Sequence, residues 1–167
     1  MNYFTNPKQI HCFQVSLANL FIELGDKNTA NQIYSRFLNH PLSNPPENIL
    51  LSPQFVEDLT NNKYTAILEI LPPKFNIEQA MKKSAPKTKI LNYINAYQNQ
   101  LDKGNIRFDE IFELNNTPCL ALLQNPVGVL DHWVTIKDDL TIINDGIIKY
   151  DSNLEDRLLG ILQVYKE

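Results

Sequence analysis

One nearly continuous apolar stretch close to the start of the chain restricts the possible folds more than any other feature. Within residues 12–24, apolar side chains recur at helical spacing and cover most of the circumference: Phe13, Val15, Leu17, Ala18, Leu20, Phe21, Ile22 and Leu24. A helix that is apolar on most sides belongs inside a domain rather than on its surface. The remaining chain must therefore supply elements that cover this helix.

The rest of the first 104 residues also favours helices. Helices are predicted over residues 29–38, 53–59, 77–83 and 87–101, and a strand is predicted over residues 64–70. Gly25 ends the first helix, and Asp26 or Asn28 caps the second. Ser52 is the expected cap of the third helix, because a proline follows it in the first turn.

From residue 106 onward the pattern changes to strands. Strands are predicted over residues 106–113, 118–124, 132–137, 140–144 and 147–151, with turns at Asp138-Asp139 and Asp145-Gly146. Residues 153–162 predict a terminal helix, or a helix followed by a strand. Helices first and an antiparallel sheet second is the α+β pattern. We expect a single domain over residues 1–167, with a helical half to about residue 104 and a β half from about residue 105.

Charge restricts the partners that the chain is suited to bind. It carries 15 Lys and Arg residues against 19 Asp and Glu residues, which gives a net charge of −4. An acidic chain without a basic run suits neither nucleic acid nor an anionic membrane surface. It also has no apolar stretch that could span a membrane and no signal-peptide pattern at its start. We expect a cytoplasmic protein, or one secreted without a cleavable signal peptide, with a peptide or protein as substrate; the oligomeric state is left open.

Two cysteines, Cys12 and Cys119, are too few for a disulfide scaffold. One bridge between them is open as an alternative to two free thiols, which suit a reducing compartment. The cysteine and histidine spacings contain no zinc-ligand pattern, so no metal and no cofactor is expected. Cys119 lies in an apolar run and is expected to be a core residue.

Cys12 and His132 have the positions that nucleophilic catalysis requires. Cys12 begins the first helix, where free backbone N–H groups favour the thiolate, the nucleophilic form of the side chain. His132 begins the first strand of the C-terminal meander and can serve as its general base and acid. The two residues are 120 positions apart, so only the fold can bring them together.

The predicted hairpin suggests a third residue. A two-residue turn at Asp138-Asp139 places His132 opposite Asp145, whose carboxylate would accept a hydrogen bond from the imidazole. A longer turn is expected to bring Asn144 there instead, and Asn has this role in some cysteine proteases. Asp151, at the far end of the third strand, is a weaker alternative. Asp145 also suits a tight turn before a glycine, which would require no catalytic role.

Four short segments resemble papain-like cysteine peptidases. PCLALL (118–123), HWVTI (132–136) and TIIND (141–145) are similar to segments of the bacteriocin-processing, double-glycine-leader peptidases. CFQVSLANL (12–20) resembles the C-x-Q-x-x-L-x-N-L helix of Josephin-type deubiquitinases. The resemblance implies a papain-like fold and a Cys12–His132–Asp145 triad. It implies a hydrolase that cleaves a peptide or isopeptide bond through a thioester.

The chain departs from these families around the nucleophile. Phe13 follows Cys12 where many of the bacteriocin-processing enzymes have glycine, and the glutamine expected five or six residues upstream is absent. Gln9 or Asn6 would then donate to the oxyanion, together with the Cys12 backbone N–H. The same residues could also perform deamidation or acyl transfer. A silent peptide-binding module, with Cys12 as a small core residue, is the alternative of a different class.

Overall fold

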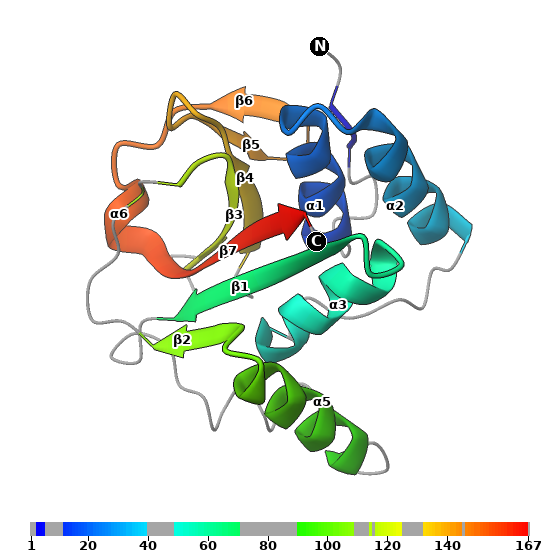
Figure 1. Cartoon of the computed structure of the whole chain (residues 1–167). Coiled ribbons are helices and arrows are strands. Elements are labelled where there is room, and N and C mark those ends of the chain that lie inside the picture. The colour runs from blue at the N-terminus through cyan, green and yellow to red at the C-terminus, as the bar shows by residue number, and fades with distance from the viewer. Residues whose placement is uncertain are drawn as a thin grey trace.

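The computed structural model describes residues 3–5, 12–39, 49–70, 90–108, 114, 116–124, 132–144 and 146–166. Helices lead and a sheet follows, so the α+β class is confirmed (Figure 1). The helices are α1 (Cys12–Glu23), α2 (Lys27–Asn39), the 3-10 turn η1 (Ile49–Leu51), α3 (Ser52–Leu59), α5 (Ile90–Asp102) and α6 (Leu154–Arg157). The strands are β1 (Tyr64–Ile70), β2 (Ile106–Phe108), β3 (Cys119–Leu123), β4 (His132–Ile136), β5 (Ile142–Asn144), β6 (Ile147–Lys149) and β7 (Leu158–Lys166).

The strands form one sheet in the order β2-β1-β7-β3-β4-β5-β6. The expectation of a purely antiparallel sheet is wrong, because β1 and β2 pair in parallel while the other pairs are antiparallel. The terminal segment is a helix followed by a strand, one of the two alternatives. β7 pairs with β1 on one side and β3 on the other, so the end of the chain joins the early strand to the meander (Figure 1).

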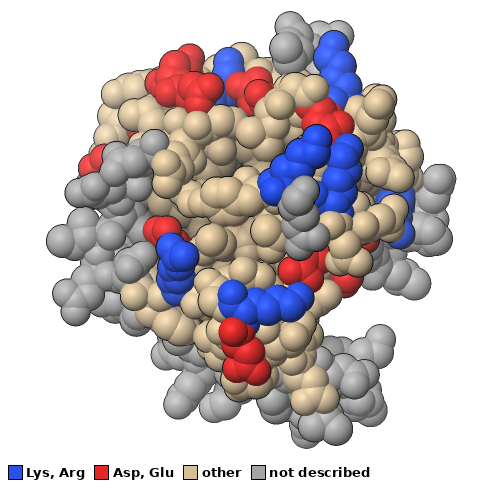
Figure 2. Space-filling model, in the orientation of Figure 1, with Lys and Arg blue, Asp and Glu red and all other residues tan. Residues whose placement is uncertain are grey.

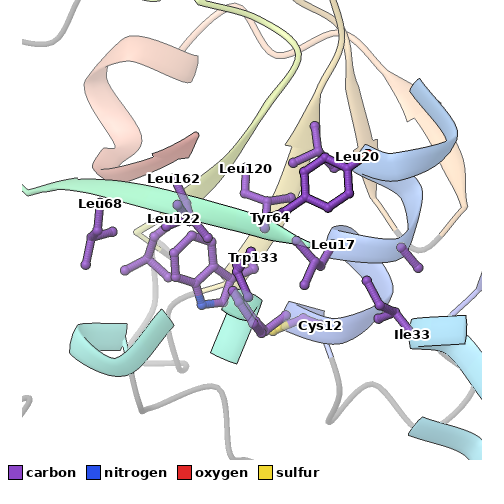
Figure 3. Close-up of a cluster of buried hydrophobic side chains, with 14 of the residues drawn as sticks. Cys12, Leu17, Leu20, Ile33, Tyr64, Leu68, Leu120, Leu122, Trp133 and Leu162 are labelled. Atoms are coloured by element: carbon purple, nitrogen blue, oxygen red, sulfur yellow. The ribbon is translucent and has the colours of Figure 1, made fainter. Parts of the chain in front are cut away.

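α1 is the centre of the packing, as its sequence predicts. All but one of its residues are buried, and its apolar side chains join a core with β1, β3, β4 and β7 (Figure 3). A second, smaller core lies on the other set of strand positions and includes Cys119, Val134 and Ile136. Because alternate residues of a strand face opposite ways, Trp133 belongs to the core of α1 while its neighbour Val134 does not.

Helix ends follow local rules that the sequence contains. Gly25 has φ +82°, and the N–H groups of Gly25 and Asp26 donate to the carbonyls of Ile22 and Phe21, which closes the end of α1. Asp26 then caps α2, accepting from the Thr29 N–H at 3.1 Å. The cap of α3 was predicted wrongly, because the helix already includes Ser52 and its cap position is Leu51.

The hairpin between β4 and β5 differs from the prediction. Thr135 pairs with Ile143 and Ile136 with Ile142, so the turn is one residue longer than a two-residue turn at Asp138-Asp139. The extra residue is Leu140, which adopts φ +66°. A left-handed residue at the end of a three-residue loop is a common hairpin geometry, but glycine or asparagine usually occupies it. Leucine carries no such signal, which is why the sequence predicted the shorter turn.

Some predictions lie outside the described residues, namely the helix over residues 77–83 and the second part of the strand over residues 106–113. Among the described helices, none has the length and hydropathy needed to cross a membrane. On the face drawn in Figure 2, acidic and basic side chains are interspersed rather than gathered by sign.

Candidate active site at the start of α1

Along the β4 edge that faces β5, the backbone is hydrogen-bonded partly to β5 and partly to the helix α1. The Lys137 N–H donates to the Thr141 carbonyl, so alternate residues of β4 direct their backbone groups toward β5. Pairing with β5 covers Thr135 and Ile136. At Trp133 the backbone groups bind α1 instead: its carbonyl accepts from the Ser16 hydroxyl at 3.0 Å, and its N–H donates to the Cys12 thiol.

Cys12 and Ser16 are one helical turn apart, so they lie on the same face of α1. A third contact joins that face to the strand, because the Thr135 hydroxyl donates to the Ser16 carbonyl at 2.7 Å. The Trp133 indole lies near Cys12 (Figure 3). It is edge-on to Phe13, with 5.3 Å between the ring centroids. These contacts determine which residues of β4 lie next to the cysteine.

Two opposing effects act on the pKa of the Cys12 thiol. Burial raises its pKa above the ordinary value, because a thiolate loses hydration there. Hydrogen bonds from the backbone N–H groups of Trp133, Phe13 and Cys12 lower the pKa but do not offset the burial. The side chain is 4% exposed. Without a proton acceptor the thiol is therefore neutral at pH 7.

His132 is held by Asn144. Its Nε2 lies 2.7 Å from the Asn144 Oδ1, and since an amide oxygen only accepts, the ring donates from Nε2. The neutral ring then has an unprotonated Nδ1. The His132 Cα is about 2.4 Å from the Trp133 nitrogen by covalent geometry, and that nitrogen donates to Cys12. His132 is thus the sequence neighbour of the residue that binds Cys12, and a contact between the thiol and the imidazole stays a prediction.

The other candidates for the third residue have different outcomes. Asp145 lies outside the described residues, so its role stays a prediction. The register places Asn144 across from Val134, so Asn144 reaches His132 diagonally rather than from directly opposite. Asp151 is engaged elsewhere, because its carboxylate pairs with Arg157 and accepts from the Asn153 N–H at 2.9 Å.

The oxyanion candidates Gln9 and Asn6 lie outside the described residues. Cys12 and Cys119 are both free thiols and both buried. Burial raises the pKa of Cys119 to about 12, and the residue lies in the second core, as expected of a structural cysteine. Within the described part of the chain, no group of three His, Cys, Asp or Glu side chains is placed to hold a metal ion.

Sequence reasoning missed the polar residues of α1. Ser16 and Asn19 are 6% and 1% exposed, although both lie on an otherwise apolar helix. The signal was their spacing, since residues 12, 16 and 19 repeat as i, i+4 and i+7 along one helix face. Gln14, another polar residue of α1, is also buried.

Comparison with known proteins adds no identification: no protein-family model, curated protein or solved structure matches this chain.

Proposed function

We propose that this protein is a papain-like cysteine hydrolase that cleaves a peptide or isopeptide bond through a thioester on Cys12. One observation carries the proposal: the His132–Asn144 hydrogen bond adjoins the β4 backbone that donates to Cys12. A histidine fixed at one ring nitrogen and a cysteine at a helix start are the two groups that thiol catalysis requires. A purely structural cysteine would need no oriented imidazole.

The proposed reaction begins with proton transfer from the Cys12 sulfur to the His132 Nδ1. The sulfur then attacks the substrate carbonyl, and the imidazolium gives its proton to the leaving amine as the carbon–nitrogen bond breaks. Water, deprotonated by the neutral imidazole, hydrolyses the thioester and restores the thiol. The Cys12 N–H, with Gln9 or Asn6, would bind the oxyanion in both halves.

In this proposal the raised pKa of Cys12 determines the role of His132. A buried thiol does not ionise alone at pH 7, so the thiolate must form as an ion pair with the imidazolium. Asn144 stabilises that ion pair by holding Nε2–H, which is a donor in both ring states. Asp145 is the alternative holder, and a carboxylate would stabilise the imidazolium more strongly.

A catalytically silent peptide-binding module is the second candidate, and the near-complete burial of Cys12 favours it. Deamidation and acyl transfer are variants of the first candidate, because they share the acyl-enzyme and differ in the acceptor or the leaving group.

Trapping of covalent adducts separates these functions. The protein is incubated with an unstructured peptide, a ubiquitin-like protein conjugate and a glutamine-containing peptide, quenched in acid, and analysed by intact and peptide mass spectrometry. A hydrolase gives an acyl adduct on Cys12 that is absent in Cys12→Ala and retained in Cys119→Ala. A folded wild-type protein without any Cys12 adduct, bound noncovalently to peptide, contradicts the hydrolase and supports the silent module.

A further inference from the structure

An N-terminal segment, residues 3–5, is fastened to the helices near the site. The Asn19 side-chain amide binds both polar groups of the Phe4 backbone. Its Oδ1 accepts from the Phe4 N–H at 2.8 Å, and its Nδ2 donates to the Phe4 carbonyl at 3.1 Å. The Tyr34 hydroxyl donates to the Thr5 carbonyl at 3.1 Å, and the Tyr34 ring stacks on Phe4. These contacts hold the backbone of the segment, so it has a defined position.

The same segment packs against the turn between β5 and β6. A Cβ atom added at Gly146 would lie 2.9 Å from the Thr5 Cγ2 and 3.1 Å from the Phe4 carbonyl oxygen. Only a residue without a side chain permits this approach, and the φ of +77° at Gly146 adds a second reason for glycine. Phe4 and Thr5 are therefore packed closely against Gly146, which lies two positions after Asn144.

Asn144 has limited support from the sheet itself. Pairing between β4 and β5 covers Thr135 and Ile136 and stops short of Asn144. On its other side Asn144 pairs with Ile147 of β6, and all three residues of β6 are exposed. A short hairpin end with little burial opens readily unless something packs on it. Residues 3–5 pack on this end of the hairpin at Gly146.

We propose that residues 3–5 act as a brace that positions Asn144 against His132, and that Asn19 is the positioning residue that holds this brace. The proposal deepens the proposed function and rests on it, because it concerns the same His132–Asn144 pair. Asn19 lies on the same face of α1 as Cys12 and Ser16, so one helix face would set the thiol, the edge of β4 and, through the brace, the third residue.

The test measures the His132 ring N–H proton by NMR of ¹⁵N-labelled protein, which requires no enzymatic activity. The hydrogen bond to Asn144 slows exchange of this proton with water. We expect exchange about 10-fold faster in Gly146→Ala, the change that corresponds to losing roughly one hydrogen bond. Gly25→Ala is the matched control, because it introduces the same positive-φ strain at φ +82° where a Cβ meets nothing within 4 Å.

Two further variants address the brace itself. Thr5→Ser removes the Cγ2 atom that the new Cβ would meet, so it should partly restore slow exchange in Gly146→Ala. Asn19→Asp retains the acceptor for the Phe4 N–H but loses the donor to its carbonyl, and should accelerate exchange as Gly146→Ala does. Slow exchange in folded Gly146→Ala, with fast exchange in Asn144→Ala, overturns the brace alone. Fast exchange in the wild-type protein overturns the hydrogen bond, and with it both proposals.

Discussion

Replacement of Asn144 by alanine is the most informative single change near the histidine. It removes the acceptor that lies 2.7 Å from the His132 Nε2 and leaves both β4 and α1 intact. A hydrogen bond of this kind contributes about 0.5–1.5 kcal/mol net, equivalent to roughly a 2- to 12-fold change in the population of the oriented ring. Loss of this bond also allows the neutral ring to adopt the other tautomer, so we expect kcat/KM to fall about 10-fold or more.

The assay is release of a fluorescent leaving group from an activated peptide ester, with the fold checked by circular dichroism. Asp145→Ala and Asp151→Ala are compared in the same assay. Asp151→Ala should lower stability, because it loses the Arg157 ion pair, but should leave kcat/KM unchanged. Full activity in Asn144→Ala, together with a loss in Asp145→Ala, would refute the assignment and restore Asp145 as the third residue.

Three further changes test the packing around the site. Tyr64→Phe removes a 2.7 Å hydrogen bond to the Asp26 carboxylate and should cost about 1.5–3 kcal/mol of unfolding free energy at pH 7. Because the folded pKa of Asp26 is lowered, the stability that this carboxylate contributes is present above about pH 4 and is lost as the pH falls. Urea unfolding should therefore show that the unfolding free energy falls less on acidification in the variant than in the wild-type protein. Cys119→Ala should lower the thermal midpoint by an amount equivalent to about 1 kcal/mol while leaving turnover intact, and an inactive but folded variant would contradict its structural role. Ser16→Ala leaves the Trp133 carbonyl without its side-chain donor and should destabilise the fold by about 1–3 kcal/mol, which denaturant titration would measure.

Local sequence signals predicted individual elements well. The apolar stripe of α1, the glycine after it and the run from Tyr64 to Ile70 are readable because each depends on neighbours in sequence. The order of strands was not readable in this way. Nothing local in residues 158–166 indicates that β7 pairs with both β1 and β3, since such pairing joins residues that are 35 to 102 positions apart.

The candidate site shows the same division. The predicted places of Cys12 at the start of a helix and of His132 at the start of a strand are confirmed, because both are local features. Asn144, which binds the His132 ring, was predicted only as an alternative to Asp145, because the choice depends on the register of a hairpin whose turn contains Leu140 at positive φ. The contact of Ser16 with the Trp133 backbone was missed, since it requires β5 to separate from β4 at that point.

The central claim is that His132 activates the buried Cys12 thiol, and the rate of Cys12 alkylation by iodoacetamide as a function of pH tests it most directly. Peptide mass spectrometry follows Cys12 alone in the folded wild-type protein and in His132→Ala. A lone buried thiol with a raised pKa reacts only at alkaline pH. We predict that the wild-type rate at pH 7 exceeds the His132→Ala rate by about 10-fold or more, because an imidazolium lowers the thiol pKa. Identical pH profiles in the two proteins, both rising only at alkaline pH, would contradict the account.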